Sequence, residues 1–418
     1  MNSRWLRAIL LLLIVVGGAL RVLEVFQHNP LDHIFSDPAR HWNQARETLI
    51  PSPMALFDPP LYQMWLSLVQ KFTLGVPWLV AAIVAALSLL TPWFWYRFLR
   101  ELLPGRDRAL AGWALFTWLP SWLGIFDYFM TETLLLPLLG AALWQTLRVR
   151  RSPGIGSFVA LALLWLLAGL ARAVALPLGL AACLWVWWSH PQRWRAGCVA
   201  ALAGALLLVP IGLRNHYYTG LWQPWGNGWP TRIYAESGQR AISMHLRRDG
   251  AQWTYGFTAP SMVQQPLQPF SSWTSVRSGE VAIDIDMTRG AADWRAALDA
   301  HAVQGVRRWW LRWENLLQIM VCESWPENNG TFLSGAAANA SRWIWAPLLL
   351  VVVAGCIVQR RAVLREPLVP ALVLLWFVLQ AVSLVAVNEG RYRLPLEGLL
   401  LVQALWLLPR RVQGERSK

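Results

Sequence analysis

Long apolar stretches separated by short polar loops make up most of this chain. These stretches lie at Leu6–Val25, Val76–Phe98, Ala109–Phe126, Thr133–Leu147, Ile155–Leu170, Ala173–Trp188, Ala196–Leu213, Trp343–Val358, Pro367–Val387 and Leu394–Leu408. A helix needs roughly 17–25 apolar residues to cross the hydrocarbon core of a bilayer. The pattern therefore predicts an all-α polytopic membrane protein with about ten transmembrane helices, of which those at 133–147 and 394–408 are the shortest.

Two longer polar segments interrupt this pattern. Residues 26–60 follow the first apolar stretch, and residues 214–342 form a segment that is rich in Gly, Pro, Gln and Trp near its start. The chain is therefore expected to comprise a transmembrane catalytic core at 1–213 that includes the first loop, a smaller mixed domain at 214–342, and further transmembrane helices with a tail at 343–418. Within the mixed domain, the spacing of apolar residues predicts one helix over Ala291–Met320.

The composition excludes an ordinary soluble enzyme. The chain has 418 residues, of which 56% are hydrophobic and only 14% charged, and its mean hydropathy is +0.37. The 29 tryptophans fit membrane interfaces, where a ring with one polar edge is favoured, or the lining of a sugar or lipid groove. Cys322 is the only cysteine in the large polar segment, so the sequence contains neither a disulfide framework there nor a metal-binding motif.

Arginine is distributed unevenly between the loops, and the formal net charge is +14. When the predicted spans are counted alternately, one side of the membrane receives Arg97, Arg100, Arg106, Arg108, Arg148, Arg150, Arg151, Arg193, Arg195, Arg360, Arg361, Arg365, Arg410 and Arg411. Cytoplasmic loops carry such an excess of basic residues. We therefore expect a multi-pass protein of the bacterial inner membrane with both termini in the cytoplasm, whose positive charge sets its orientation rather than binding nucleic acid.

Ionisable residues also gather at the opposite, periplasmic ends of the predicted spans. They are Asp37, Asp58, Glu132, Arg172, Glu389, Arg391 and Arg393. When carboxylates and arginines collect at one set of span ends, a functional site there is the default expectation. Carboxylates paired with guanidinium groups at a membrane surface suit a lipid-phosphate substrate.

Three of these residues also have purely structural interpretations. Asp37 lies in Ser36-Asp37-Pro38, which can open a short helix with Ser36 or Asp37 as its N-cap and proline at the first helical position. Glu132 can form an ion pair with an arginine, and Arg393 can act as an interfacial anchor. After this loop, Leu61–Phe72 is predicted to form an amphipathic helix along the membrane interface.

Several short motifs occur in a fixed order on the periplasmic side of the chain. They are Ser36-Asp37-Pro38-Ala39-Arg40, Asp58-Pro59-Pro60-Leu61-Tyr62, Met130-Thr131-Glu132-Thr133-Leu134, Ala171-Arg172-Ala173 and Arg391-Tyr392-Arg393-Leu394-Pro395. Together they resemble membrane glycosyltransferases of the C-type fold (GT-C), in the group of the protein O-mannosyltransferases and the lipid A aminoarabinose transferase. Two departures leave donor and acceptor open. Asp58 stands where a basic residue often precedes the Pro-Pro of the lipid A enzymes, and Pro38 replaces an acidic residue of the mannosyltransferases.

The resemblance implies a sugar donor carried on polyprenyl phosphate and an acceptor that is a lipid, a polysaccharide or a protein. In such a transfer a carboxylate takes the proton of the acceptor hydroxyl, and guanidinium groups stabilise the leaving phosphate. Asp37 fits the base, and Glu132 fits a residue that orients the acceptor or the base. The predicted substrate-binding residues are Arg172, Arg391, Tyr392, Arg393, Asp58 and Glu389. No cofactor is expected; Asp37 and Glu132 can share a divalent ion, but nothing in their spacing requires one.

Two other functions remain open at this stage. A transporter or flippase for a lipid-linked sugar would need polar groups near the bilayer midplane and usually has repeated halves, whereas the charges here lie at span ends and no repeat is visible. A non-catalytic assembly subunit of the same fold is the second alternative, although the complete set of acidic and basic residues argues against it. The sequence names neither the sugar nor the acceptor nor the oligomeric state.

Overall fold

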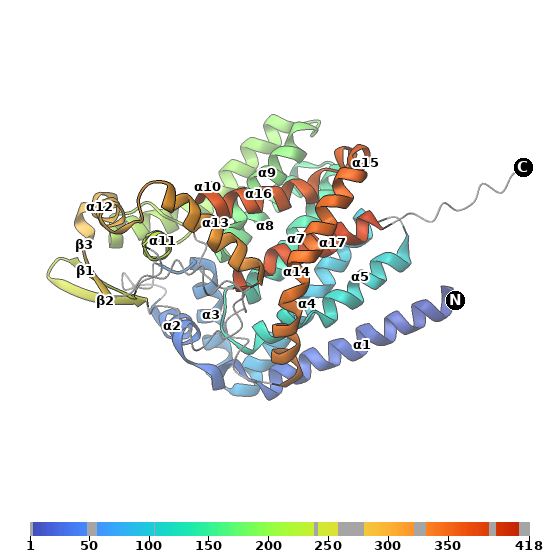
Figure 1. Ribbon diagram of the computed structural model, residues 1–418, viewed down its shortest axis with the longest axis horizontal. Coiled ribbons are helices and arrows are strands. Elements are labelled where there is room, and N and C mark those ends of the chain that lie inside the picture. Colours follow the sequence, from blue (N-terminus) through green and yellow to red (C-terminus); the bar gives the residue numbers. More distant parts are fainter. Residues whose placement is uncertain are drawn as a thin grey trace, which may run out of the picture.

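The computed structural model describes residues 3–47, 57–103, 105–237, 241–257, 280–321, 332–383 and 390–408, and most of them are helical (Figure 1). The helices of the main bundle are α1 (Ser3–Gln27), α4 (Pro77–Leu102), α5 (Arg106–Trp118), α6 (Pro120–Gly124), α7 (Glu132–Arg151), α8 (Ile155–Ala171), α9 (Ala175–Trp188), α10 (Arg193–Thr219), α14 (Phe332–Val358), α15 (Arg360–Arg365), α16 (Leu368–Ser383) and α17 (Leu394–Leu407). Within the described residues, each apolar stretch of the sequence thus forms a helix or, at residues 109–126, a broken one.

Fewer of these helices than expected have the length and composition of a membrane span. In the described part of the chain three do so, namely Arg4–Gln27, Pro77–Leu102 and Arg193–Thr219, and the bent pair α5–α6 makes up to four. Four shorter apolar helices, in α8, α9, α14 and α16, accompany them. The prediction of about ten spans counted α7 as well. That helix ends in three arginines, and its side chains are mostly buried against α4, α8, α9 and α17, so it occupies the centre of the bundle.

The break between α5 and α6 has a clear cause in the sequence. Pro120 lacks an N–H and clashes with the preceding turn, and the two halves meet at an angle of 56°. The carbonyl groups that the break leaves free are satisfied by the fully buried Arg21 of α1, whose Nε donates to the carbonyl of Thr117 at 2.8 Å and whose Nη2 donates to that of Phe116 at 2.8 Å. These hydrogen bonds from Arg21 fix the position of the segment that leads into the start of α7.

The first polar loop folds into short helices at one end of the bundle. They are η1 (Pro30–His33), α2 (Ser36–Gln44), η2 (Ala45–Glu47) and α3 (Pro60–Thr73). The N-cap of α2 is Phe35 and has no side-chain cap bond, so the predicted capping role of Ser36 or Asp37 is wrong. The predicted amphipathic helix at Leu61–Phe72 is confirmed by α3, which leaves Phe72 77% exposed.

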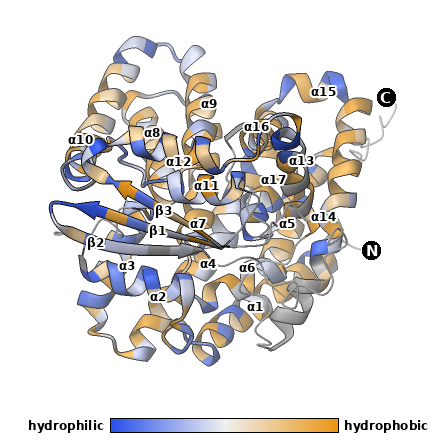
Figure 2. Cartoon of the chain, turned by 60° about the vertical axis from the view of Figure 1, so that its left-hand side comes forward, coloured by the Kyte–Doolittle hydropathy of each residue, from blue (hydrophilic) through white to orange (hydrophobic). Residues whose placement is uncertain are grey.

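A small mixed domain packs beside this end of the bundle. Its sheet has the order β2-β1-β3, in which β1 (Ala241–Arg248) pairs antiparallel with β2 (Ala251–Phe257) and parallel with β3 (Glu280–Asp286). Helices α11 (Trp229–Glu236) and α12 (Ala291–His301) pack on the sheet around the buried Trp294. Figure 2 shows that the bundle helices carry long apolar stretches, whereas the strands include long hydrophilic ones.

The single helix predicted at Ala291–Met320 is two helices. It breaks after α12, and α13 (Val306–Val321) follows Gly305, whose φ of +65° is a left-handed conformation that favours glycine. The apolar residues whose spacing predicted one helix are divided between two surroundings, because Trp294 of α12 is completely buried whereas Trp309 of α13 is 58% exposed. The apolar period continues across the break, but Gly305 changes the direction of the chain.

The two ends of the bundle differ in their charged residues. The arginine-rich loops meet at one end, where Arg7 pairs with Asp107 at 2.5 Å and Arg150 pairs with Glu366 at 2.8 Å. The other end, which we call the outer end, carries the C-termini of α1 and α8, the N-termini of α7 and α17, and the small domain (Figure 1). Those predicted site residues that the structure describes therefore lie at the end opposite the arginine-rich loops.

Candidate functional site

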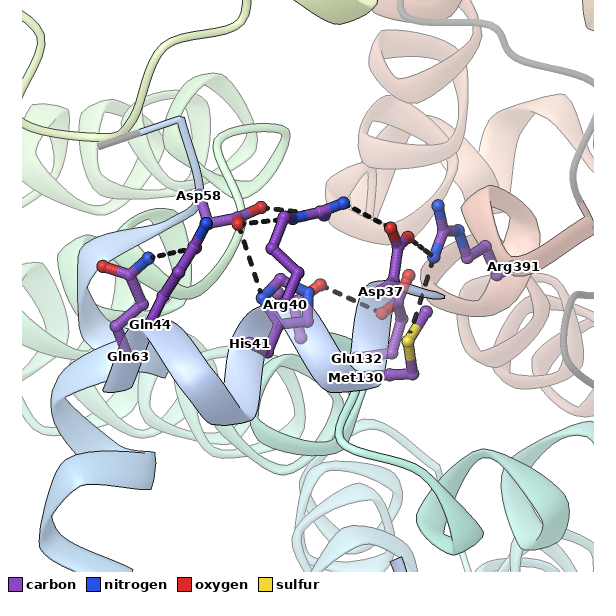
Figure 3. A network of polar contacts seen from close by, with 10 residues as sticks. Asp37, Arg40, His41, Gln44, Asp58, Gln63, Met130, Glu132 and Arg391 are labelled. Carbon is purple, nitrogen blue, oxygen red and sulfur yellow. Dashed lines mark hydrogen bonds and ion pairs between the residues drawn. The ribbon is translucent and has the colours of Figure 1, made fainter. Parts of the chain in front are cut away.

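Asp37 occupies the first turn of α2 and contacts two arginines from different parts of the chain (Figure 3). Its Oδ1 accepts a hydrogen bond from Nη1 of Arg40 at 2.5 Å, and its Oδ2 accepts one from Nη1 of Arg391 at 2.7 Å. The same Nη1 of Arg391 lies 3.9 Å from the sulfur of Met130. Arg391 belongs to η8 (Gly390–Arg393), 354 positions away from Asp37. The fold therefore brings the predicted catalytic carboxylate into contact with a predicted substrate-binding arginine.

Arg40 connects Asp37 to a second carboxylate. Its Nε and Nη2 donate to the two oxygens of Asp58 at 2.8 and 3.1 Å, which is the bidentate geometry that a planar guanidinium favours. Nδ1 of His41 lies 3.7 Å from Oδ2 of Asp58. Asp58 is therefore held by Arg40 rather than standing free as a ligand, and the network continues through a hydrogen bond between the side chains of Gln63 and Gln44.

A second ion pair lies at the start of α7. Glu132 is buried and pairs with Arg172, which follows the last residue of α8. The guanidinium of Arg172 lies 4.4 Å from the ring centroid of Tyr392, and that of Arg391 lies 5.5 Å from the same ring. Tyr392 thus joins the pair Glu132–Arg172 to the pair Asp37–Arg391, so five of the predicted site residues form one cluster. We call this set, with Arg40 and Asp58, the outer cluster.

The charges of the outer cluster keep Asp37 ionised. Burial favours the neutral carboxyl, but the positive charges of Arg40 and Arg391 outweigh this and hold the pKa of Asp37 well below its usual range. Burial lowers the pKa of His41 to about 4, despite the opposing charge of Asp58, so the imidazole is neutral at pH 7. The contact between His41 and Asp58 is accordingly not an ion pair at neutral pH.

The remaining two predicted residues are placed differently. Arg393 is 1% exposed, and its side chain donates to Oε1 of Glu397 at 2.8 Å and to the carbonyl of Ile319 at 2.6 Å. Ser121 donates to the other oxygen of Glu397 at 2.6 Å. Arg393 therefore connects α17, α6 and α13 inside the protein, in what we call the inner cluster. Glu389 lies outside the described residues.

The sequence interpretation assigned no role to Arg40 or His41, although their spacing contained a signal. They lie three and four positions after Asp37, and residues at these separations share one face of a helix. Once Asp37 is placed in a helix, Arg40 is expected beside it. The contact of Arg40 with Asp58 had no comparable signal, because it joins residues 18 positions apart that do not share one helix.

Within the residues that the structure describes, no group of three or more His, Cys, Asp or Glu side chains is arranged to hold a metal ion. The outer cluster instead offers an ionised carboxylate next to two guanidinium groups that are only partly buried. Comparison with known proteins adds nothing to this description: no family model, no curated protein and no solved structure matches the chain.

Proposed function

We propose that the protein is an integral-membrane glycosyltransferase that moves a sugar from a polyprenyl-phosphate donor to a lipid, polysaccharide or protein acceptor. In this proposal the four shorter apolar helices, together with α7 and α17, complete a bundle of about ten spans with C-type architecture. The bundle lies in a bacterial inner membrane with both termini in the cytoplasm, and the outer cluster faces the periplasm. The observation that carries the proposal is the ionised carboxylate of Asp37 between the guanidinium groups of Arg40 and Arg391.

A phosphate group fits this arrangement because it can replace one carboxylate oxygen as a partner of Arg391. The side chain of Arg391 is 12% exposed and that of Asp37 is 19% exposed, so both remain within reach of a ligand from outside. A guanidinium group binds a phosphate through two parallel hydrogen bonds, as it binds a carboxylate. Donor binding would then transfer Arg391 from Oδ2 of Asp37 to the phosphate.

This exchange prepares Asp37 for proton transfer. With Arg391 bound to the phosphate, the carboxylate loses one of the charges that depress its pKa and becomes a stronger base. The acceptor hydroxyl then attacks the anomeric carbon, its proton passes to Oδ2 of Asp37, and the bond between the sugar and the phosphate oxygen breaks. The leaving phosphate gains negative charge, which Arg391 stabilises, while Asp37 loses its charge.

The other members of the outer cluster have supporting roles in this proposal. Arg40 holds Asp37 and Asp58 in place, because it donates to both carboxylates. Glu132 pairs with Arg172, whose guanidinium lies against the ring of Tyr392 and whose side chain is 14% exposed, so in this proposal Arg172 is a second phosphate ligand. Arg393 has no direct contact with the phosphate in this proposal, because its side chain is 1% exposed and donates to Glu397 and to the carbonyl of Ile319.

The test is genetic complementation with a chemical readout. Mass spectrometry of cell-envelope glycans and glycolipids identifies any sugar that disappears when the gene is deleted. The wild-type gene should restore it, whereas Asp37→Asn should not, because an amide accepts no proton. A general base contributes a rate factor of about 10² to 10⁴, so the variant should leave the modification near the deletion level.

Asp107→Asn provides the matched control. Asp107 also pairs with an arginine, but at the opposite end of the bundle. The Asp107→Asn variant should therefore restore the modification fully. The proposal fails if a stably inserted Asp37→Asn protein restores the modification as well as Asp107→Asn does. It also fails if deletion changes no glycan or glycolipid.

A further inference from the structure

Helix α13 presents a continuous row of large apolar side chains that nothing in the described chain covers. The row consists of Val306, Trp309, Trp310, Trp313 and Leu317, which are exposed by 86%, 58%, 61%, 55% and 46%. The spacing i, i+3, i+4, i+7 and i+11 places them on one face of a helix. We call this surface the tryptophan face. It is continuous over three turns, unlike the scattered exposed apolar residues of an ordinary surface.

The opposite side of α13 is firmly attached to the small domain. Arg308 pairs with the buried Glu236 of α11, and Nη2 of Arg312 lies 3.7 Å from the same carboxylate. Leu311 is buried on this side as well. These contacts fix the rotation of the helix, so the tryptophan face points outward as a consequence of its packing.

The end of α13 connects the tryptophan face to the bundle. Ile319 and Met320 are buried in the same apolar cluster as the bundle helices, and α13 contacts α14 and α16. These two helices carry outward-facing apolar residues of their own, such as Ile344 at 58% and Leu374 at 65% exposure. Figure 1 draws α13 where the small domain meets the bundle. The helix that carries the tryptophan face therefore packs directly against two bundle helices with apolar exteriors.

We propose that the tryptophan face of α13 inserts into the outer headgroup region of the bilayer and holds the small domain against the membrane. Tryptophan is favoured at this depth because its ring is apolar and its N–H remains hydrated. The guanidinium of Arg312 lies 4.6 Å from the ring centroid of Trp309, and the exposed Arg307 lies at the edge of the face. An amphipathic helix with basic residues beside its apolar face binds anionic lipid surfaces.

Helix α3, from another part of the chain, also has an exposed apolar face and so supports the same placement of the membrane. Its exposed apolar residues Met64, Leu68 and Phe72 repeat every four positions along one face. Figure 2 places α3 and α13 on different sides of the molecule, and Figure 1 draws both near the boundary between the small domain and the bundle. Two apolar helix faces at this boundary fit one lipid surface around the protein.

The test measures how deeply a label on α13 lies in the bilayer. The full chain, with Cys183, Cys198, Cys322 and Cys356 replaced by alanine or serine, is reconstituted in nanodiscs that contain phosphatidylglycerol. A single cysteine is introduced as Trp313→Cys and labelled with an environment-sensitive fluorophore. Leu317→Cys gives a second position on the same face, and Ala251→Cys on the β1–β2 hairpin gives an exposed control on the small domain.

Lipids with a spin label on the upper acyl chain should quench the labels at 313 and 317 severalfold more than the label at 251, and aqueous iodide should show the reverse order. The proposal is overturned if iodide quenches all three labels equally, because α13 then faces water. It is also overturned if neither quencher reaches the labels at 313 and 317, because a protein surface or a second copy of the chain then covers them. Neither outcome depends on sugar transfer.

Discussion

The outer and inner clusters use arginines from the same short segment in different ways. Arg391 belongs to the outer cluster, where the side chains of Arg391, Asp37 and Arg40 are 12%, 19% and 24% exposed. Arg393 belongs to the inner cluster, where its side chain and that of Glu397 are 1% and 0% exposed. A partly exposed ion pair can exchange one partner for a ligand, whereas a fully buried pair has no access to one.

The difference also concerns what each cluster connects. The inner cluster joins Arg393, Glu397 and Ser121 with a backbone carbonyl of α13, so it links α17, α6 and α13 inside the protein. The outer cluster has its carboxylates on the first polar loop and on α7. If the two clusters have separate roles, substitutions in the inner cluster should affect stability first, and substitutions in the outer cluster should affect ligand binding first.

The largest effect is expected for Arg393→Ala. Removing one partner of a buried ion pair leaves an unpaired buried charge, which typically costs about 3–5 kcal/mol of stability. Thermal unfolding of the purified protein in detergent should detect this loss. Arg7→Ala is the control, because Arg7 and Asp107 form a pair whose side chains are 44% and 33% exposed, and its loss should cost less than about 1 kcal/mol. Equal stability of the two variants would contradict the structural role of the inner cluster.

The next effect concerns pH and His41. The folded state lowers the pKa of His41 to about 4, while the unfolded state binds a proton near pH 6.5. The unfolded state therefore holds more protons between these values, so stability should fall as the pH drops from about 6.5 to 4, by up to about 3 kcal/mol. Denaturant unfolding of wild type and His41→Gln at pH 7 and pH 5 tests this. Between pH 7 and pH 5, the variant should lose less stability than wild type. If both proteins lose the same amount, His41 is not the cause of the pH dependence.

Asp37 should contribute no pH dependence of stability over the same range. Burial raises the pKa of Asp37, but the charges of Arg40 and Arg391 outweigh burial and hold this pKa below the usual range. The stability from its ion pairs is thus present above the unfolded pKa of about 3.9 and is lost only below it. Between pH 7 and pH 5, Asp37 should therefore contribute no change in stability.

A smaller effect is expected for Arg391→Ala on the binding of a short-chain polyprenyl monophosphate. Losing one charge-assisted contact costs about 1.5–3 kcal/mol, which is about tenfold to over a hundredfold in affinity. Arg391→Lys should retain part of the affinity, because lysine keeps the charge but loses the planar pair of donors. Arg7→Ala serves as the charge control. If Arg391→Ala binds as tightly as wild type, Arg172 becomes the first candidate for the phosphate ligand.

The sequence predicted the helices well because their signal is local. Apolar runs and prolines determine where helices begin and end, and Pro120 and Gly305 mark breaks that the apolar period alone does not show. Whether a helix spans the membrane is a different question, because it depends on what surrounds it. The burial of α7 inside the bundle is a property of its neighbours and could not be read from its own residues.

The candidate site was predicted in part for a similar reason. Counting the predicted spans alternately was enough to predict that Asp37 and Arg391 lie at the same end of the bundle. It could not separate Arg391 from Arg393, because both precede α17 and both carry the same charge. The separation depends on Glu397, which lies one helical turn after Arg393 and accepts its hydrogen bond.

The measurement that tests the central claim most directly is the affinity of Asp37→Asn for a short-chain polyprenyl monophosphate, set beside its failure to restore the envelope modification. The amide releases Arg391 from its ion pair, so the variant should bind the phosphate at least as tightly as wild type while it transfers no sugar. The account is contradicted if Asp37→Asn loses phosphate affinity as Arg391→Ala does, because Asp37 then serves only to hold the arginine. It is equally contradicted if the variant binds normally and restores the modification.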